Sequence, residues 1–318
     1  MRNDHPSRRD ALKAGILATA GMALGIPRTL LAHSTALQSG TLITRPIPSS
    51  GQRIPVVGIG TNAYNLSAEL RPRLRDTMKR FVEVGGSVYD SATGYSGGES
   101  ESVIGELHTE LKLRDKLFLV TKITSGADAV RGRELFQTSL TRLKTDRIDA
   151  LLIHNLAGVE PMMPVMQEWK KEGRIKYVGI STSNNSQYDA LMGHMRNYPL
   201  DIIQVDYSIG NRDAEPVLKL AQERKIAVMA NVPLGGRRGA TEGLELLKEL
   251  PAWAAEFDCK TPAQFLLKFV VSHPAMTVAI PGTRQVAHVE DNNQAARGKL
   301  PDEATRQRMA QHYDTLKG

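Results

Sequence analysis

The fold of this chain is decided by the stretch LFLVTKITSGADAVRGRELFQTSLTRLKTDRIDALLIHN, residues 117–155. It begins with an almost continuously apolar run, 117–123, continues through an amphipathic segment, 131–143, and ends in a second apolar run, 149–155. An apolar run without polar alternation is typical of a parallel strand that is buried on both faces. The stretch therefore predicts a strand, a crossover helix and a second strand parallel to the first.

The same alternation extends from this stretch in both directions along the chain. The other strand-like runs are residues 56–60, 87–92, 177–182, 202–208, 227–233 and 277–282, and the other helix-like segments are 69–84, 100–111, 162–173, 186–196, 215–224, 262–272 and 286–296. Eight strands with eight helices is the count of a (β/α)8 TIM barrel, whereas a doubly wound open sheet usually has fewer strands. We expect an α/β fold of the barrel type.

Three further segments are expected in addition to the eight strands and eight helices of the barrel. Residues 41–55 are predicted to form a hairpin before the first strand. The connection 234–261 is long and contains a predicted helix at 241–257, so that an extended loop after strand seven lies over the catalytic mouth. Residues 301–316 are predicted to form a closing helix. Residues 37–318 are thus expected to form one domain.

The first 36 residues have the pattern of an export signal. Ser7-Arg8-Arg9-Asp10-Ala11-Leu12-Lys13 is a twin-arginine pattern, and the apolar segment 14–26 is too short to span a membrane comfortably. Small residues at 34–36 suit cleavage after Ala36. We expect a twin-arginine signal peptide over residues 1–36, read by the twin-arginine export machinery, and a periplasmic or otherwise exported protein without a stable membrane span after cleavage. Retention as an uncleaved anchor and an amphipathic helix with an incidental arginine pair are the alternatives.

Composition excludes several function classes. The 318 residues are 41% hydrophobic and 24% charged, with a formal net charge of +7, as in a globular protein with a mildly basic surface. Such a surface suits an anionic cofactor or substrate, and without a basic stripe interleaved with aromatics no nucleic-acid partner is expected. The sequence has no zinc-type spacing, so no metal is expected, and the single cysteine, Cys259, excludes an intramolecular disulfide.

Polar residues end three successive predicted strands, where barrel enzymes place their active sites. Asp90, Lys122 and His154 occupy these ends, and Tyr95 follows in the loop that leaves strand two. A phenol exchanges protons poorly near neutral pH, but a neighbouring ammonium stabilises its ionised form and a carboxylate keeps the ammonium charged. With a neutral histidine as hydrogen-bond donor, the set predicts carbonyl/alcohol interconversion. Taken singly, each residue is also compatible with a structural ion pair or a satisfied core histidine.

Over residues 40–318 the chain resembles the aldo-keto reductases. The matching stretches are VVGIGTN, VYDSATGYSGGESESVIGEL, FLVTKI, DALLIHN, RIKYVGIST, IIQVDYS, VPLGG and IPGTRQVAHVEDN. In that family an Asp-Tyr-Lys-His tetrad is catalytic, and its order and spacing match Asp90, Tyr95, Lys122 and His154. The most specific part is Asp-x4-Tyr followed by Glu101-x3-Gly105. The resemblance implies an NADP(H)-dependent oxidoreductase that interconverts an aldehyde or ketone and its alcohol by hydride transfer, with Tyr95 as general acid/base.

The resemblance also implies a dinucleotide site. The nicotinamide carboxamide would be held by side chains at Ser181, Thr182 and Gln204. Backbone amides after the seventh strand, at Leu234 and Gly235, would approach the pyrophosphate. The adenosine phosphate would be reached from the last strand and helix, by Gly282, Thr283, Arg284, His288, Asp291 and Asn292.

Two positions depart from the family pattern. Asn231 stands where an aromatic usually stacks on the nicotinamide, and Gly282 stands where some members have a lysine for the 2′-phosphate. Arg284 offers a replacement cation, which favours NADP(H) over NAD(H) without excluding the latter. Arg237 and Arg238 in the long loop are either a clamp for pyrophosphate or an acidic substrate, or solvated surface charges.

Two other functions stay open on the sequence. A nucleotide-bound sensor or interaction subunit would keep the barrel and cofactor but have little turnover. A sugar-processing barrel would need two facing carboxylates, for which only Asp90 and Asp206 offer themselves. Because free nicotinamide cofactors are chiefly cytoplasmic, we expect an exported enzyme to bind its cofactor tightly before export.

Overall fold

The computed structural model describes residues 40–236 and 242–317. The predicted signal peptide, residues 1–36, and the loop residues Arg237 and Arg238 lie outside the described residues.

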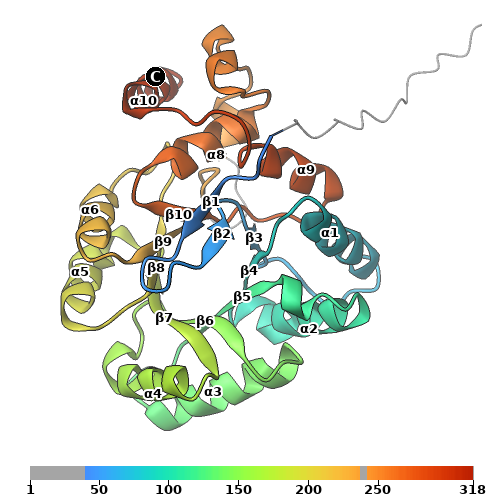
Figure 1. The fold of residues 1–318 in the computed structure, drawn as a ribbon, viewed down its shortest axis with the longest axis vertical. Helices are drawn as coiled ribbons and strands as arrows, with labels where there is room; N and C mark the ends of the chain where they lie inside the picture. The colour runs from blue at the N-terminus through green and yellow to red at the C-terminus, as the bar shows by residue number, and fades with distance from the viewer. Residues whose placement is uncertain (1–39, 237–241, 318) are drawn as a thin grey trace, which may run out of the picture. The chain divides into compact units, whose positions relative to one another are not determined.

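Eight parallel strands form one sheet in the order β10-β9-β8-β7-β6-β5-β4-β3, which curls into a barrel (Figure 1). Parallel bridges between Val57 and Ala279 and between Gly60 and Gly282 join the first strand to the last and close the barrel. The strands are β3 Ile59–Gly60, β4 Val88–Asp90, β5 Phe118–Ile123, β6 Ile148–His154, β7 Ile175–Thr182, β8 Ile202–Asp206, β9 Ala227–Asn231 and β10 Met276–Ala279. The predicted (β/α)8 barrel is confirmed.

Helices surround the strands because each has one apolar face that packs on the sheet. The ring consists of α1 Arg71–Glu83, α2 Glu99–Glu110, α3 Ala129–Arg142, α4 Val159–Lys171, α5 Tyr188–Asn197, α6 Glu215–Glu223, α8 Pro262–Ser272 and α9 Val286–Gln294, and α10 Glu303–Thr315 follows it. Side-chain caps begin several of them: Asp128, Thr261 and Asp302 accept backbone N–H groups at the starts of α3, α8 and α10. None of the described helices is long and apolar enough to cross a membrane.

The predicted hairpin is present and plugs one end of the barrel interior. Strands β1 Thr44–Pro46 and β2 Arg53–Pro55 pair antiparallel. The hairpin residues Ile47 and Ile54 are buried and belong to the cluster of side chains that fills the barrel, and the Tyr177 hydroxyl from β7 bonds to the turn between β1 and β2, at Ser50 Oγ (2.6 Å). Because the hairpin occupies this end of the barrel, the polar site described below lies at the other end, at the carboxyl ends of the strands.

The long connection after β9 differs in part from the prediction. In place of one helix over 241–257, the described residues form a short helix, α7 Glu242–Leu246, and a separate 3-10 turn, Ala252–Phe257. Pro251 explains the interruption, because proline lacks the N–H that a continuing helix needs and disfavours helical backbone at the residue before it.

Candidate active site

A buried lysine organises the candidate site. Lys122 lies in β5, and its Nζ donates to both carboxylate oxygens of Asp90, at 2.7 and 2.8 Å, and to the backbone carbonyl of Ser91, at 2.8 Å. Lys122 is 0% exposed and Asp90, the last residue of β4, is 3% exposed. Burying two charges is costly unless they satisfy one another, and this bidentate pair meets that condition.

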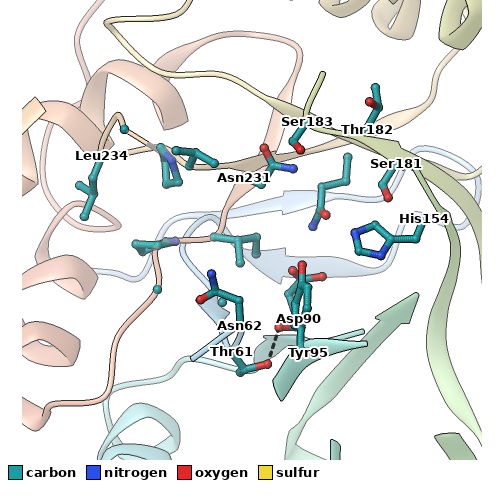
Figure 2. Close-up of a pocket in the computed structure, with 18 of the residues that line it drawn as sticks. Thr61, Asn62, Asp90, Tyr95, His154, Ser181, Thr182, Ser183, Asn231 and Leu234 are labelled. Atoms are coloured by element: carbon teal, nitrogen blue, oxygen red, sulfur yellow. Dashed lines mark hydrogen bonds between the residues drawn. The ribbon is translucent and has the colours of Figure 1, made fainter. Parts of the chain in front are cut away.

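The Tyr95 side chain contacts both Lys122 and His154. Its phenol oxygen lies 3.4 Å from Lys122 Nζ, and the ammonium lies 5.0 Å from the ring centroid. On its other side the Tyr95 ring meets the imidazole of His154 edge-on, with centroids 5.9 Å apart. The four predicted residues are thus brought together, with the phenol between a cation and an imidazole. Figure 2 shows three of them, Asp90, Tyr95 and His154.

Burial and charge set the protonation states. Burial raises the pKa of Asp90, and the ammonium of Lys122 counteracts this. Burial alone would lower the pKa of Lys122, but Asp90 and Tyr95 together raise it above its ordinary value. Burial, with a smaller contribution from Lys122, lowers the pKa of His154 to about 4. At neutral pH, an ammonium and an uncharged imidazole therefore flank the phenol.

A cavity of about 460 Å³ opens above these residues. Asp90, Tyr95 and His154 line it together (Figure 2). Lys122, which is paired with Asp90, does not line the cavity. The cofactor residues predicted from the resemblance that line it are Ser181, Thr182, Gln204, Asn231, Leu234, Gly235 and Gly282. The sequence reasoning missed Asn155 and Ser183, which also line it and directly follow strand-end residues that were predicted.

A second cavity, of about 540 Å³, adjoins the first. The two share Gly60, Asn62, Leu234 and Gly282 in their walls and so form one continuous cleft. The remaining predicted cofactor residues line this second cavity: Thr283, Arg284, His288, Asp291 and Asn292. Lys248, which follows α7 in the long loop, lines it too and was not predicted. All twelve predicted cofactor residues thus lie along the cleft.

The cleft fits an extended dinucleotide. The amide oxygen of Asn231 is buried at its inner end and has no hydrogen-bond partner in the described part of the chain, an arrangement that a carboxamide N–H would satisfy. At the outer end, Arg284 and Lys248 are exposed cations in the wall of one cavity. A ligand with an uncharged amide at one end and phosphate at the other matches this distribution.

Several predicted cofactor residues already have partners within the protein, and Thr182 and Asp291 are two of them. The Thr182 hydroxyl donates to Gln187 Oε1 (2.5 Å) and accepts the backbone N–H of Asn184. The Asp291 carboxylate accepts from Thr261 and from Gln264, which tie α9 to the start of α8. Both side chains are therefore held in place before any ligand binds.

Asp206 does not join Asp90 in the cleft. It ends β8 and is buried, but it lines neither cavity. The described cleft walls therefore lack the facing pair of Asp90 and Asp206 that a sugar-processing barrel would require. No group of three or more His, Cys, Asp or Glu side chains suited to a metal ion occurs among the described residues.

Comparisons with known proteins agree with this geometry. The model of the aldo/keto reductase family matches residues 56–312. The methylglyoxal reductase YeaE of Escherichia coli strain K12 is 30% identical over 246 residues, which cover 75% of this chain and 84% of that protein. An aldo/keto reductase from Klebsiella pneumoniae in complex with NADP and acetate has the same fold, with a TM-score of 0.72 at 24% identity over 86% of this chain and 96% of that chain.

A further structure, an aldo-keto reductase from Klebsiella pneumoniae in complex with NADPH, has a TM-score of 0.70 and 25% identity over the same shares of the two chains. The family match spans the whole barrel, from the strand that opens it to the last helix. The chain is an enzyme that belongs to the aldo/keto reductase family.

Proposed function

We propose that this enzyme interconverts an aldehyde or ketone and its alcohol by hydride transfer, with NADP(H) as cofactor. The observation that carries the proposal is the position of the Tyr95 phenol. It contacts the buried ammonium of Lys122 on one side and the uncharged imidazole of His154 on the other, and it opens into the cleft that all twelve predicted cofactor residues line.

Each of the four residues has one task in this proposal. Tyr95 gives its proton to the carbonyl oxygen, and a bound NADPH would supply the hydride to the carbonyl carbon. Lys122 stabilises the phenolate that forms, and Asp90 holds the ammonium in place. His154, uncharged at neutral pH, donates an N–H to the carbonyl oxygen and orients it. In the oxidation direction the same groups act in reverse.

The cofactor preference rests on the charges of the outer cavity. Arg284 and Lys248 line it together with His288, and Arg284 is in no ion pair among the described residues. A 2′-phosphate would give these cations a partner, and an unphosphorylated ribose would not. The related Klebsiella pneumoniae enzymes were solved with NADP and NADPH, which supports the same choice here.

A turnover screen tests the function. The purified enzyme is incubated with small aldehydes and ketones and with NADPH or NADH, and loss of the reduced nicotinamide is followed. Turnover with at least one carbonyl compound and a higher kcat/KM for NADPH are expected. Tight binding of nucleotide without turnover of any substrate would favour the sensor function instead, and failure to bind either nucleotide would refute the proposal.

We also propose that residues 1–36 direct export by the twin-arginine route. The support is the Arg8-Arg9 pair, the apolar segment after it and the small residues before position 37. Residues 1–36 fused to a reporter should carry it into the periplasm, and changing Arg8 and Arg9 to Lys should abolish this. Export that is unaffected by the double substitution would contradict the proposal.

A further inference from the structure

The loop that carries Tyr95 has a backbone that needs outside support. Tyr95 begins a 3-10 turn, Tyr95–Gly98, in which Ser96, Gly97 and Gly98 all have left-handed backbone, with φ of 48°, 65° and 102°. Such conformations are unfavourable for an L-residue such as Ser96 and persist only when the surroundings enforce them. The phenol at the start of the turn must nevertheless be placed accurately, because its 3.4 Å contact with Lys122 is near the upper limit for a hydrogen bond.

Arg142, the last residue of α3, reaches this loop from outside the cleft. Its Nη1 donates to the backbone carbonyl of Thr93, two residues before Tyr95, at 3.1 Å. The N–H and the hydroxyl of Thr93 both donate to the Lys122 carbonyl, at 3.0 and 3.1 Å. Thr93 is therefore fixed between the β5 backbone on one side and the Arg142 guanidinium on the other.

The same guanidinium contacts the far end of the turn. A Cβ added to Gly98 would lie 2.2 Å from Arg142 Cζ and would displace the guanidinium, and the φ of 102° also favours glycine there. Arg142 Nη1 also lies 3.5 Å from Oε2 of Glu101, in the first turn of α2. Arg142 thus contacts the chain both before and after Tyr95.

Glu101 is a buried anchor for this arginine. It is 0% exposed, and its Oε1 accepts from Thr121 Oγ1 at 2.6 Å, next to Lys122 in β5. Its Oε2 has no hydrogen bond in the described part of the chain, so the Arg142 guanidinium at 3.5 Å offsets the cost of burying this carboxylate. Gly105 lies one helical turn after Glu101 on the same face of α2, and a Cβ there would be 2.1 Å from the Arg142 carbonyl oxygen. Glycine at that position lets α2 and α3 approach closely enough for the contact.

We propose that Arg142 and Glu101 form a clamp, outside the cleft, that positions the Tyr95 phenol over Lys122. The proposal gives the Glu101-x3-Gly105 spacing a physical role: one residue anchors the arginine and the other admits its helix. Neither Arg142 nor Glu101 lines the cleft, so both are positioning residues that act through Tyr95. The inference rests on the proposed function of Tyr95 as proton donor.

The test compares Arg142→Met with Arg131→Met, a matched control in the same helix whose exposed guanidinium contacts only Glu134 among its described partners. Because a displacement of about 1 Å at a reacting group can cost about 100-fold in rate, kcat of Arg142→Met should fall by roughly 10- to 100-fold. The Kd for NADPH should stay within about twofold of the control, and Arg142→Lys should restore part of kcat. The deuterium isotope effect on kcat, with deuterium at the transferred position of NADPH, should rise.

A kcat of Arg142→Met within about twofold of the control, with an unchanged isotope effect, would overturn the clamp. If Arg142→Met does not fold, Glu101→Gln and Arg142→Lys are compared instead, because both nearly keep the side-chain volume. A fall in kcat at constant NADPH affinity in either variant supports the clamp, and an unchanged kcat in both refutes it. Tyr95→Phe separates this result from the proposed function. Loss of activity in Tyr95→Phe with full activity in Arg142→Met refutes the clamp alone, whereas activity retained in Tyr95→Phe refutes the role of Tyr95 itself.

Discussion

Replacing His154 by Gln tests the electrostatics of the site through the pH dependence of stability. The pKa of His154 in the folded protein is lowered to about 4 from an ordinary value of 6.5, chiefly by burial. The folded state therefore binds fewer protons than the unfolded state between these values. The resulting stabilisation is complete above pH 6.5 and is lost as the pH falls toward 4. The difference corresponds to about 3 kcal/mol of unfolding free energy at most.

The assay is urea unfolding of the wild type and of His154→Gln at pH 7 and pH 4.5. The wild type should lose roughly 2 to 3 kcal/mol more than His154→Gln between the two pH values. His194→Gln, a substitution outside both cavities, is the matched control and should follow the wild type. An NMR titration of the His154 imidazole measures its pKa directly. A midpoint close to 6.5, or equal losses in the wild type and His154→Gln, would refute the uncharged, partly buried imidazole.

Three further perturbations have definite expected outcomes. Lys122→Met leaves the Asp90 carboxylate buried without its partner and should destabilise the protein by about 3 to 5 kcal/mol, whereas adding Asp90→Asn should recover much of the loss. Urea unfolding checks both variants, and a cost of Lys122→Met under about 1 kcal/mol would contradict the buried pair. Gly105→Ala should cost about 1 to 3 kcal/mol, because its Cβ would lie 2.1 Å from a backbone oxygen of α3, and an unchanged midpoint in urea would show that the helices can separate freely. Arg284→Gln together with Lys248→Gln should weaken NADPH binding by about 10- to 100-fold and leave NADH binding nearly unchanged, and equal losses for both nucleotides in fluorescence titrations would argue against a 2′-phosphate site.

The strands of the barrel could be predicted because buried parallel strands are apolar along their whole length. Their ends were harder to place. The run 227–233 was predicted as one strand, but β9 ends at Asn231, because Val232 has a left-handed backbone with φ 51°. Valine strongly favours strands, so nothing in its own chemistry signals this turn, which the packing of the loop imposes.

The set of Asp90, Tyr95, Lys122 and His154 could be predicted because strand ends that are neighbours in a parallel sheet meet at one edge, and Tyr95 lies in the loop that follows one of them. The cations of the outer cavity could be predicted only in part. Arg284 follows the last strand directly, whereas Lys248 reaches the cavity through a long loop whose path depends on tertiary packing. The contact of Arg142 with the Tyr95 loop joins residues 49 positions apart and leaves no local pattern in the sequence.

The central claim is that the Tyr95 phenol supplies the proton as hydride reaches the carbonyl carbon. Rapid mixing of the preformed enzyme–NADPH complex with a carbonyl substrate, in the wild type and in Tyr95→Phe, measures that step in a single turnover. Tyr198→Phe, outside the cleft, is the matched control. The account predicts that Tyr95→Phe slows NADPH oxidation by at least about 100-fold while the Kd for NADPH changes by less than about threefold. Oxidation at a rate close to that of Tyr198→Phe would contradict it.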